Sequence, residues 1–181
     1  LEHDRGDYDE EIENDLYNGS LKSFTEAAAR NGVRVAPDDT WSDIFSRILT
    51  EIIEPHLGNG RATILDRYPV SEAALARRCP DDPSFAERFE LYACGVELAN
   101  AFGELTDPVE QRRRFESDMA EKERLYGERY PLDEDFLNAL AHMPPASGIA
   151  LGFDRLVLLA TGAEDVAEVI FTPWPFGETS G

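Results

Sequence analysis

Three glutamates, Glu90, Glu97 and Glu104, recur at intervals of seven residues within the stretch RFELYACGVELANAFGE, which covers residues 88–104. Each glutamate has apolar neighbours in the sequence, and burying an unpaired carboxylate is very costly. The set therefore predicts a cationic partner, which would be a metal ion, an ammonium group or an arginine. The alternative is a hairpin with a solvated acidic face, because acidic side chains usually lie outside.

Two secondary structures compete for this stretch. A spacing of seven would stack the glutamates on one face of a helix. Two glycines within the stretch oppose a helix, and residues 89–92 read as a strand. Cys94-Gly95 fits a tight two-residue turn with glycine at its second position. In that register we expect Leu91 to face Leu98.

The hairpin would also bring the glutamates together. Tyr92 would face Glu97, so Glu90 and Glu97 become diagonal neighbours on one side of the sheet. Two carboxylates close enough to repel indicate a hard divalent cation with oxygen ligands. Glu104 lies past the second strand and would face a cationic substrate. Strict alternation puts Asn100 on the face opposite Glu97, so a shared pocket requires a bulge between them.

A second block, SGIALGFDRLVLL, covers residues 147–159. Small residues alternate with large apolar ones, which predicts a strand whose small face lets a flat ligand approach the backbone. A helix is expected to begin near Asp154 and to end at Thr161-Gly162. Arg155 lies in its first turn, where an arginine is unfavourable unless an anion is present. A nucleotide phosphate would supply that anion; the alternative is an ion pair with one of the three glutamates.

The two blocks, in this order, resemble the lysine branch of the class II aminoacyl-tRNA synthetases. Residues 88–107 match the pattern RFEL, a turn and then E-[IL]-A-N-[AG]-F-x-E-L-[NT]-D, and the second block matches motif 3, G-h-x-h-G-h-D-R-h-h-h. The similarity runs from about Tyr68 to Val169. It implies an α+β fold, an antiparallel sheet flanked by helices. The whole chain, residues 1–181, would be one domain, the C-terminal part of a synthetase-like catalytic domain.

The resemblance also implies roles for single residues. Glu90 and Glu97 would hold magnesium and the ATP phosphates. Glu104 would bind the side-chain amine of lysine, with Asn100 and Phe102 lining the same pocket.

In the second block, the resemblance implies that Gly152 lies against the adenine. Arg155 would contact the terminal ATP phosphates and is the candidate catalytic residue. The implied chemistry is acyl transfer in two steps, in which the lysine carboxylate attacks the α-phosphate of ATP and an acceptor then attacks the adenylate. Positioning and charge neutralisation suffice for such a reaction, so no acid-base dyad is required.

Two positions bear on the substrate and the acceptor. Lysyl-tRNA synthetases usually have a glutamate where this chain has Ser71 and a glycine where it has Ala150, whereas the related ligases that modify elongation factor P have serine and alanine. This resemblance favours activation of lysine or (R)-β-lysine and its transfer to a lysine of elongation factor P. The alternatives are a lysyl-tRNA synthetase, with tRNA-Lys as acceptor, and a non-catalytic paralogue. A homodimer is expected in each case.

The N-terminal residues LEHDR partly match the family's L-E-W-Y-R, which ends its second motif, and Glu2 would then also approach the lysine. Motifs 1 and 2 are otherwise not visible, so the chain is expected to begin just after them. Residues 1–20 are very acidic and poorly patterned, and we expect these residues and residues 172–181 to be flexible.

The composition of the chain limits which partners, cysteine sites and cellular location are expected. The 181 residues carry a formal net charge of −20, which disfavours non-specific binding to nucleic acid. Cys79 and Cys94 have neither metal-site spacing nor a disulfide framework, and no apolar run is long enough to span a membrane. These features predict a cytoplasmic protein.

Local patterns predict the remaining elements. Helices are expected at 21–30, from Thr40 to a stop at Pro55 and Gly58, at 108–126 after an Asp107 cap, and at 132–140. Short strands are expected at 62–65, as a buried strand, and at 166–170, as a closing strand. Arg112, Arg113 and Arg114 point three ways around their helix, which suits scattered salt bridges better than a phosphate clamp.

Overall fold

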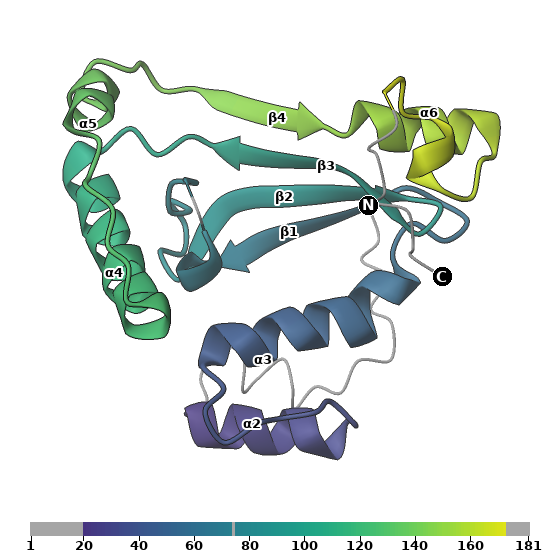
Figure 1. Ribbon diagram of the computed structural model, residues 1–181, viewed down its shortest axis with the longest axis horizontal. Coiled ribbons are helices and arrows are strands. Elements are labelled where there is room, and N and C mark those ends of the chain that lie inside the picture. Colours follow the sequence, from purple (N-terminus) through teal and green to yellow (C-terminus); the bar gives the residue numbers. More distant parts are fainter. Residues whose placement is uncertain (1–19, 74, 173–181) are drawn as a thin grey trace, which may run out of the picture.

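The computed structural model describes residues 20–73 and 75–172 of the chain. Its centre is an antiparallel four-stranded sheet in the order β1-β2-β3-β4 (Figure 1). The strands are β1 (Thr63–Pro69), β2 (Phe85–Ala93), β3 (Val96–Gly103) and β4 (Ser147–Leu151). The α-helices are α2 (Leu21–Arg30), α3 (Trp41–Ile48), α4 (Pro108–Tyr126), α5 (Glu134–Leu140) and α6 (Phe153–Thr161). The expected α+β fold, an antiparallel sheet flanked by helices, is confirmed.

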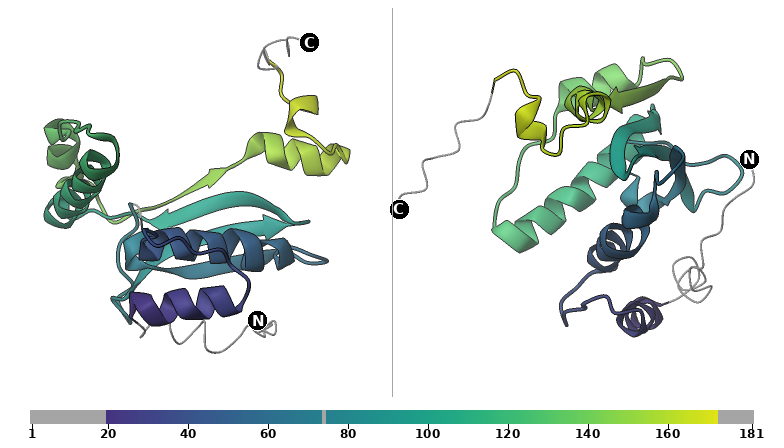
Figure 2. Two further views of the ribbon diagram at one scale, coloured as in Figure 1. Left: turned by 60° about the horizontal axis from the view of Figure 1, so that its bottom comes forward. Right: turned by 90° about the vertical axis from the view of Figure 1, so that its right-hand side faces the viewer.

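The helices surround the sheet on several sides. Helices α2 and α3 lie together beside the sheet, α4 and α5 stand at one end of it, and α6 follows β4 at the other end (Figures 1 and 2). Phe45 of α3 contacts Tyr68 of β1, with ring centroids 6.4 Å apart. Within the described part of the chain, none of the helices has the length and hydrophobicity that a membrane crossing requires.

Helices α2 and α3 form where the local signals predicted them. Ser20 caps α2 by accepting a hydrogen bond from the Ser23 amide. Thr40 and Asp43 form a capping box at the start of α3. The chain continues from α3 into a π-helical turn (Leu49–Ile53) and a 3-10 turn (Glu54–His56).

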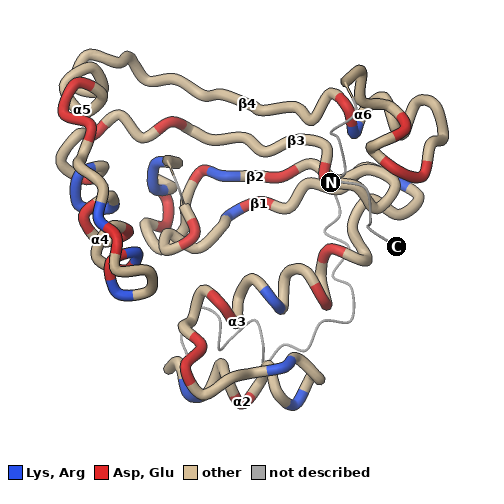
Figure 3. Tube along the Cα trace, viewed as in Figure 1, with Lys and Arg blue, Asp and Glu red and all other residues tan. Residues whose placement is uncertain are grey.

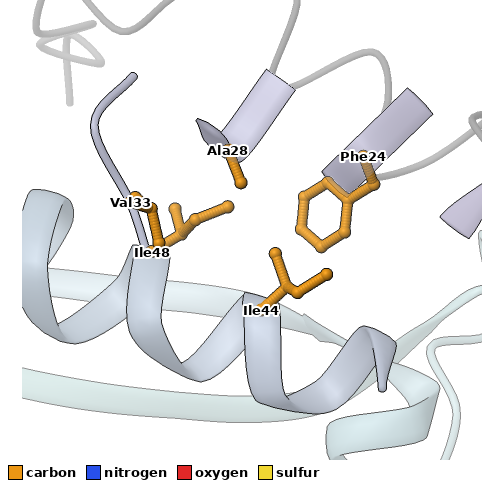
Figure 4. Close-up of a cluster of buried hydrophobic side chains, with 5 residues drawn as sticks. All are labelled: Phe24, Ala28, Val33, Ile44 and Ile48. Atoms are coloured by element: carbon orange, nitrogen blue, oxygen red, sulfur yellow. The ribbon is translucent and has the colours of Figure 1, made fainter. Parts of the chain in front are cut away.

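The core between α2 and α3 is entirely apolar. Figure 4 shows its buried cluster, which consists of Phe24, Ala28, Val33, Ile44 and Ile48. The Trp41 ring stacks on Phe24 at 5.4 Å and on Phe45 at 5.1 Å, between ring centroids. These aromatic rings are therefore core residues that fix the two helices to each other.

The central hairpin of β2 and β3 has the predicted turn and a corrected register. Cys94 and Gly95 both have positive φ, 53° and 73°, as a tight two-residue hairpin turn requires. Tyr92 faces Glu97 as expected. The expected pair of Leu91 and Leu98 is wrong, because Leu91 faces Ala99.

The cause of this shift is a β-bulge. Between the pair Tyr92–Glu97 and the pair Leu91–Ala99, strand β3 has one more residue than β2. A bulge of this kind reverses the alternation of side chains beyond it. Asn100 therefore faces Glu90 directly, as a pocket shared by Asn100 and Glu97 requires.

Two predicted strands are corrected. Strand β1 is longer than residues 62–65 and is not buried, since Ile64 is 59% exposed; it lies at an edge of the sheet. Residues 166–170 do not form a closing strand. They begin with a 3-10 turn (Val166–Glu168), because Asp165 and Glu168 form a capping box that starts a helical turn.

Helix α4 begins and ends as predicted, with Asp107 as N-cap and Gly127 in the left-handed region at φ 68°. Acidic and basic residues are interspersed along it (Figure 3). Its three successive arginines pair with two glutamates, Arg112 with Glu134 of α5, and both Arg113 and Arg114 with Glu110. The prediction of scattered salt bridges is confirmed.

Candidate functional site

One face of the sheet collects most of the candidate residues. Side chains alternate along each strand, and the bulge in β3 brings Asn100 and Phe102 to the side that carries Glu97. Ala150 and Gly148 of β4 stand opposite Asn100 and Phe102 on that side. We call this side the polar face and define it by Arg88, Glu90, Tyr92, Glu97, Asn100 and Phe102.

Glu90 is the centre of the polar face and is only 6% exposed. Its Oε1 accepts a hydrogen bond from Arg88 Nη2 at 2.7 Å and another from Asn100 Nδ2 at 3.0 Å. Its Oε2 accepts one from the Tyr92 hydroxyl at 2.8 Å. The expected cationic partner of this buried carboxylate is therefore an arginine in the same strand.

Arg88 is itself held in place on several sides. Its Nη1 donates to the Glu72 carbonyl at 2.6 Å. Its guanidinium carbon lies 4.2 Å from the centre of the Tyr68 ring and 5.7 Å from that of Phe102. The side chains of Arg88 and Glu90 are 18% and 8% exposed, so this ion pair is shielded from water.

Tyr68, whose ring contacts Arg88, follows a residue with a strained backbone conformation. Its neighbour Arg67 has φ 59° at an irregularity of β1, which is rare for a residue with a side chain. Burial, more than the neighbouring Glu90 carboxylate, raises the pKa of the Tyr68 hydroxyl. Tyr68 was not a candidate from sequence.

Glu104 reaches the polar face through a gap left by a glycine. A Cβ atom at Gly148 would come within 2.7 Å of Glu104 Oε1. Gly148 faces Phe102 across β3 and β4, so the Glu104 carboxylate lies beside Phe102 on the same side of the sheet. The structure therefore places Glu104, Phe102 and Asn100 on one side of the sheet.

Arg155 forms an ion pair with Glu97, which was the alternative to a nucleotide phosphate as its partner. Its Nη1 donates to Glu97 Oε2 at 3.0 Å and to the Glu97 carbonyl at 2.9 Å. A Cβ at Gly152 would come within 3.3 Å of Arg155 Cδ, so the glycine gives this side chain room to cross the end of β4. With Arg155 48% exposed, the pair is open to water and to an incoming anion.

A carboxylate that sequence reasoning missed joins Glu97. Glu54, Tyr92, Glu97 and Arg155 line an open pocket of about 430 Å³. Burial raises the pKa of the Glu54 carboxyl, a hydrogen bond with Tyr92 opposes this, and the charges of Glu90 and Glu97 add to it. No local signal in the sequence marks Glu54, because it reaches Tyr92 only through the π-helical turn (Leu49–Ile53).

The other candidates lie at the margin of the polar face or outside it. Ala150 is exposed on β4, opposite Asn100. Ser71 is exposed in a 3-10 turn (Val70–Glu72), next to the carbonyl that binds Arg88. Glu2 and both predicted flexible ends, apart from Ser20 and Thr172, lie outside the described residues.

The residues of the polar face fit a magnesium ion only in part. Their oxygen donors suit Mg²⁺, which proteins commonly hold with one or two carboxylates plus substrate phosphates. Glu97 fits this role, because it is half-buried at the wall of an open pocket. Glu90 fits less well, because Arg88 already pairs its charge. In the part of the chain that the structure describes, no three His, Cys, Asp or Glu side chains are grouped to hold a metal.

Residues 8–175 match the family model described as tRNA synthetases class II (D, K and N). The lysine–tRNA ligase of Pelotomaculum thermopropionicum is 40% identical over 161 residues, which cover 86% of this chain and 31% of the relative. The lysine–tRNA ligase of Helicobacter pylori strain P12 is 43% identical over 143 residues, 78% of this chain and 28% of the relative.

The chain thus spans about a third of the length of these curated relatives. Within that span, the similarity includes both sequence blocks and the strands that carry them. From the family match over most of its residues, we conclude that this chain belongs to the class II tRNA synthetases of the D, K and N group.

Proposed function

We propose that this chain is part of the catalytic domain of a lysine–tRNA ligase. In this role it binds lysine and ATP, promotes formation of lysyl-adenylate and presents the activated lysyl group to tRNA-Lys. The observation that carries the proposal is the bulge of β3, which puts Asn100 and Phe102 on the polar face beside Glu104. The names of the relatives support lysine as the substrate and tRNA as the acceptor.

The polar face suggests a role for each side chain. Glu104 binds the side-chain ammonium of lysine, since a carboxylate beside an aromatic ring suits a cationic amine. Asn100 and Phe102 line the same pocket, and Ala150 lies on its β4 side.

A second set of side chains serves the nucleotide. Arg155 exchanges its exposed bond with Glu97 for the terminal ATP phosphates, and Gly152 lies against the adenine. A Mg²⁺ ion, when bound, neutralises charge on the phosphates. Glu97 holds it from the protein side, and Glu90 contributes a negative charge behind it.

A second candidate function is transfer of lysine or (R)-β-lysine to elongation factor P. It is favoured by Ser71 and by Ala150, whose methyl group stands opposite Asn100 and takes space that a glycine would leave open. We rank it second because the relatives found are lysine–tRNA ligases.

The test is ATP–pyrophosphate exchange with magnesium, in which α-lysine is compared with (R)-β-lysine. Preference for α-lysine, followed by charging of tRNA-Lys, is the expected result. Preference for β-lysine, with transfer to elongation factor P, would instead establish the second candidate. If neither amino acid supports exchange and lysine does not bind, the chain acts as a non-catalytic paralogue. The homodimer that the resemblance implies is checked by sedimentation equilibrium.

A further inference from the structure

We propose that the ion pair between Arg155 and Glu97 is an autoinhibitory contact, which makes its pocket bind a divalent cation and a polyphosphate together rather than singly. The inference rests on the proposed function, because it takes the anion to be the phosphate chain of a nucleotide and the cation to be the accompanying magnesium ion. It concerns what these two side chains do to each other before either ligand is bound. We call them the Arg155–Glu97 pair.

The Arg155–Glu97 pair is closed by two hydrogen bonds from one nitrogen. Arg155 Nη1 donates to Glu97 Oε2 at 3.0 Å and to the Glu97 carbonyl oxygen at 2.9 Å. Arg155 lies in the first turn of α6, and the amide of Gly152, directly before that helix, donates to the Leu98 carbonyl at 2.8 Å. The start of α6 is thereby fixed to β3, so the pair can open by rotation of its two side chains while the backbone stays in place.

Both members of the pair can be reached by a ligand. Arg155 and Glu97 line the open pocket of about 430 Å³. Their side chains are 48% and 33% exposed. An ion pair with this exposure is screened by water and contributes little free energy, so a ligand that enters the pocket can replace either partner.

An anion that enters alone meets a pocket with an excess of carboxylates. Among the described residues, the charged side chains in the lining are Glu54, Glu97 and Arg155. While the pair is closed, Glu97 neutralises Arg155. A phosphate chain that takes Arg155 leaves Glu97 unpaired beside its own negative charge, and like charges at short range repel. The closed pair therefore opposes a polyphosphate without a metal ion.

A divalent cation that enters alone meets the opposite difficulty. If it takes Glu97, the Arg155 guanidinium is left unpaired beside the cation. When both ligands are present, the cation takes Glu97 and the phosphates take Arg155, so neither side chain is left without a partner. Each ligand then raises the affinity of the protein for the other, and this coupling is reciprocal.

The backbone bond keeps Arg155 within reach of the phosphates. The carbonyl oxygen of Glu97 belongs to β3 and cannot turn away with the carboxylate. A guanidinium has five N–H donors, so Arg155 can keep the carbonyl bond and still donate to phosphate oxygens. Opening the pair thus releases the charge of Arg155 without releasing its position.

The test measures the binding of each ligand alone by calorimetry. The anion probe is tripolyphosphate in the presence of EDTA. Glu97→Gln keeps the shape of the side chain but removes the charge that holds Arg155, so the Kd for tripolyphosphate should fall about 2- to 5-fold, the factor that an exposed ion pair is worth. Glu54→Gln is the matched control. It removes a carboxylate from the same pocket but not the partner of Arg155, so the Kd should stay within about 1.5-fold of the wild type, since exposed charges are screened.

The reciprocal measurement uses Mg²⁺ alone, without nucleotide. Arg155→Met removes the competitor for Glu97, so the Kd for Mg²⁺ should fall by a similar factor, about 2- to 5-fold. A double variant completes the cycle. In the Arg155→Met background, Glu97→Gln should no longer strengthen binding of tripolyphosphate, because no pair is left to open.

Equal effects of Glu97→Gln and Glu54→Gln on tripolyphosphate would overturn the inference, because the general charge of the pocket would then oppose the anion. Unchanged binding of tripolyphosphate to Glu97→Gln, or of Mg²⁺ to Arg155→Met, would also overturn it. Failure of the proposed function looks different, since the unsubstituted protein would then bind neither tripolyphosphate nor ATP with magnesium.

Discussion

The α2–α3 pair and the polar face of the sheet each have a buried centre, but different forces hold these two centres together. Between α2 and α3, the cluster of Phe24, Ala28, Val33, Ile44 and Ile48 contains no polar side chain. At the polar face, the buried centre is an ion pair of Arg88 and Glu90 with two further hydrogen bonds to the carboxylate.

The difference indicates what each region is for. Apolar burial stabilises in proportion to the area removed from water, so the helix pair contributes stability. A buried ion pair contributes little net stability, because desolvation of both charges offsets their attraction. The polar face therefore fixes the geometry of side chains, whereas the helix pair supports the sheet that carries them.

The largest expected effect tests the apolar side of this comparison. Phe24→Ala should lower the free energy of unfolding by roughly 4 kcal/mol, because it leaves a cavity in a fully buried cluster. Leu21→Ala, in the same helix but 47% exposed, is the matched control and should change it by less than about 0.5 kcal/mol. Urea unfolding measures both. Equal effects of the two variants would show that the cluster does not dominate the stability of this unit.

The next test concerns the ion pair. Arg88→Met should lower the free energy of unfolding by roughly 3 kcal/mol, because it leaves Glu90 buried with an unpaired charge. The double variant with Glu90→Leu should recover most of that loss and still fail to bind lysine, as measured by urea unfolding and calorimetry. If the double variant is as unstable as the single one, the pair contributes more to stability than the comparison allows.

A third test addresses the connection between the two regions. Gly58 follows the helical segment and accepts a hydrogen bond from the Cys94 amide at 2.8 Å. At Gly58, φ is +73° and a Cβ would lie 2.8 Å from the backbone of Ala93. Gly58→Ala should therefore lower the melting temperature by an amount equivalent to about 2–3 kcal/mol.

Gly60 provides the control for that substitution. Its φ is +76°, but a Cβ there meets no atom within 4 Å. Gly60→Ala should cost only the left-handed conformation, about 1 kcal/mol. A Gly58→Ala variant no less stable than Gly60→Ala would show that the close approach to Ala93 is not needed.

The smallest expected effect is a dependence of stability on pH in the helix pair. A hydrogen bond from Arg47 lowers the pKa of Asp39 from 3.8 to about 2. Since the folded state holds this proton less tightly than the unfolded state, the stabilisation is complete above about pH 4 and is lost as the pH falls toward 2. Melting temperatures between pH 5 and 2 should fall more steeply for the wild type than for Asp39→Asn. Parallel curves would contradict this role.

Elements that depend on local signals could be predicted from the sequence, whereas the pairing register between the strands could not. Helix α2, the capping box at Thr40 and the turn at Cys94-Gly95 depend on neighbouring residues, and all were found as predicted. The position of the bulge depends on how β2, β3 and β4 pair. Sequence indicated that a bulge was required, but not that it would separate Leu91 from Leu98.

Site residues could be predicted where their positions follow from the alternation of side chains within one strand. Glu90, Asn100 and Phe102 were expected on the sheet, but Arg88 as the partner of Glu90 was not. Residues 88 and 90 share a face in any strand, so this pair could have been read from the alternation. Glu54 could not, because it reaches Tyr92 only through a π-helical turn that widens the end of α3.

The bulge of β3 makes the length of this segment matter as much as its composition. Glu97 and Asn100 are three positions apart, an odd number, yet they share a face because one extra residue changes the parity of the strand. Removing the extra residue, Leu98, would restore strict alternation and leave Ala99 opposite Leu91 and Asn100 opposite Glu90. Between the turn and Asn100, loss of this one bulge residue should therefore be tolerated, whereas loss of a second residue would exchange the sides of Asn100 and Phe102.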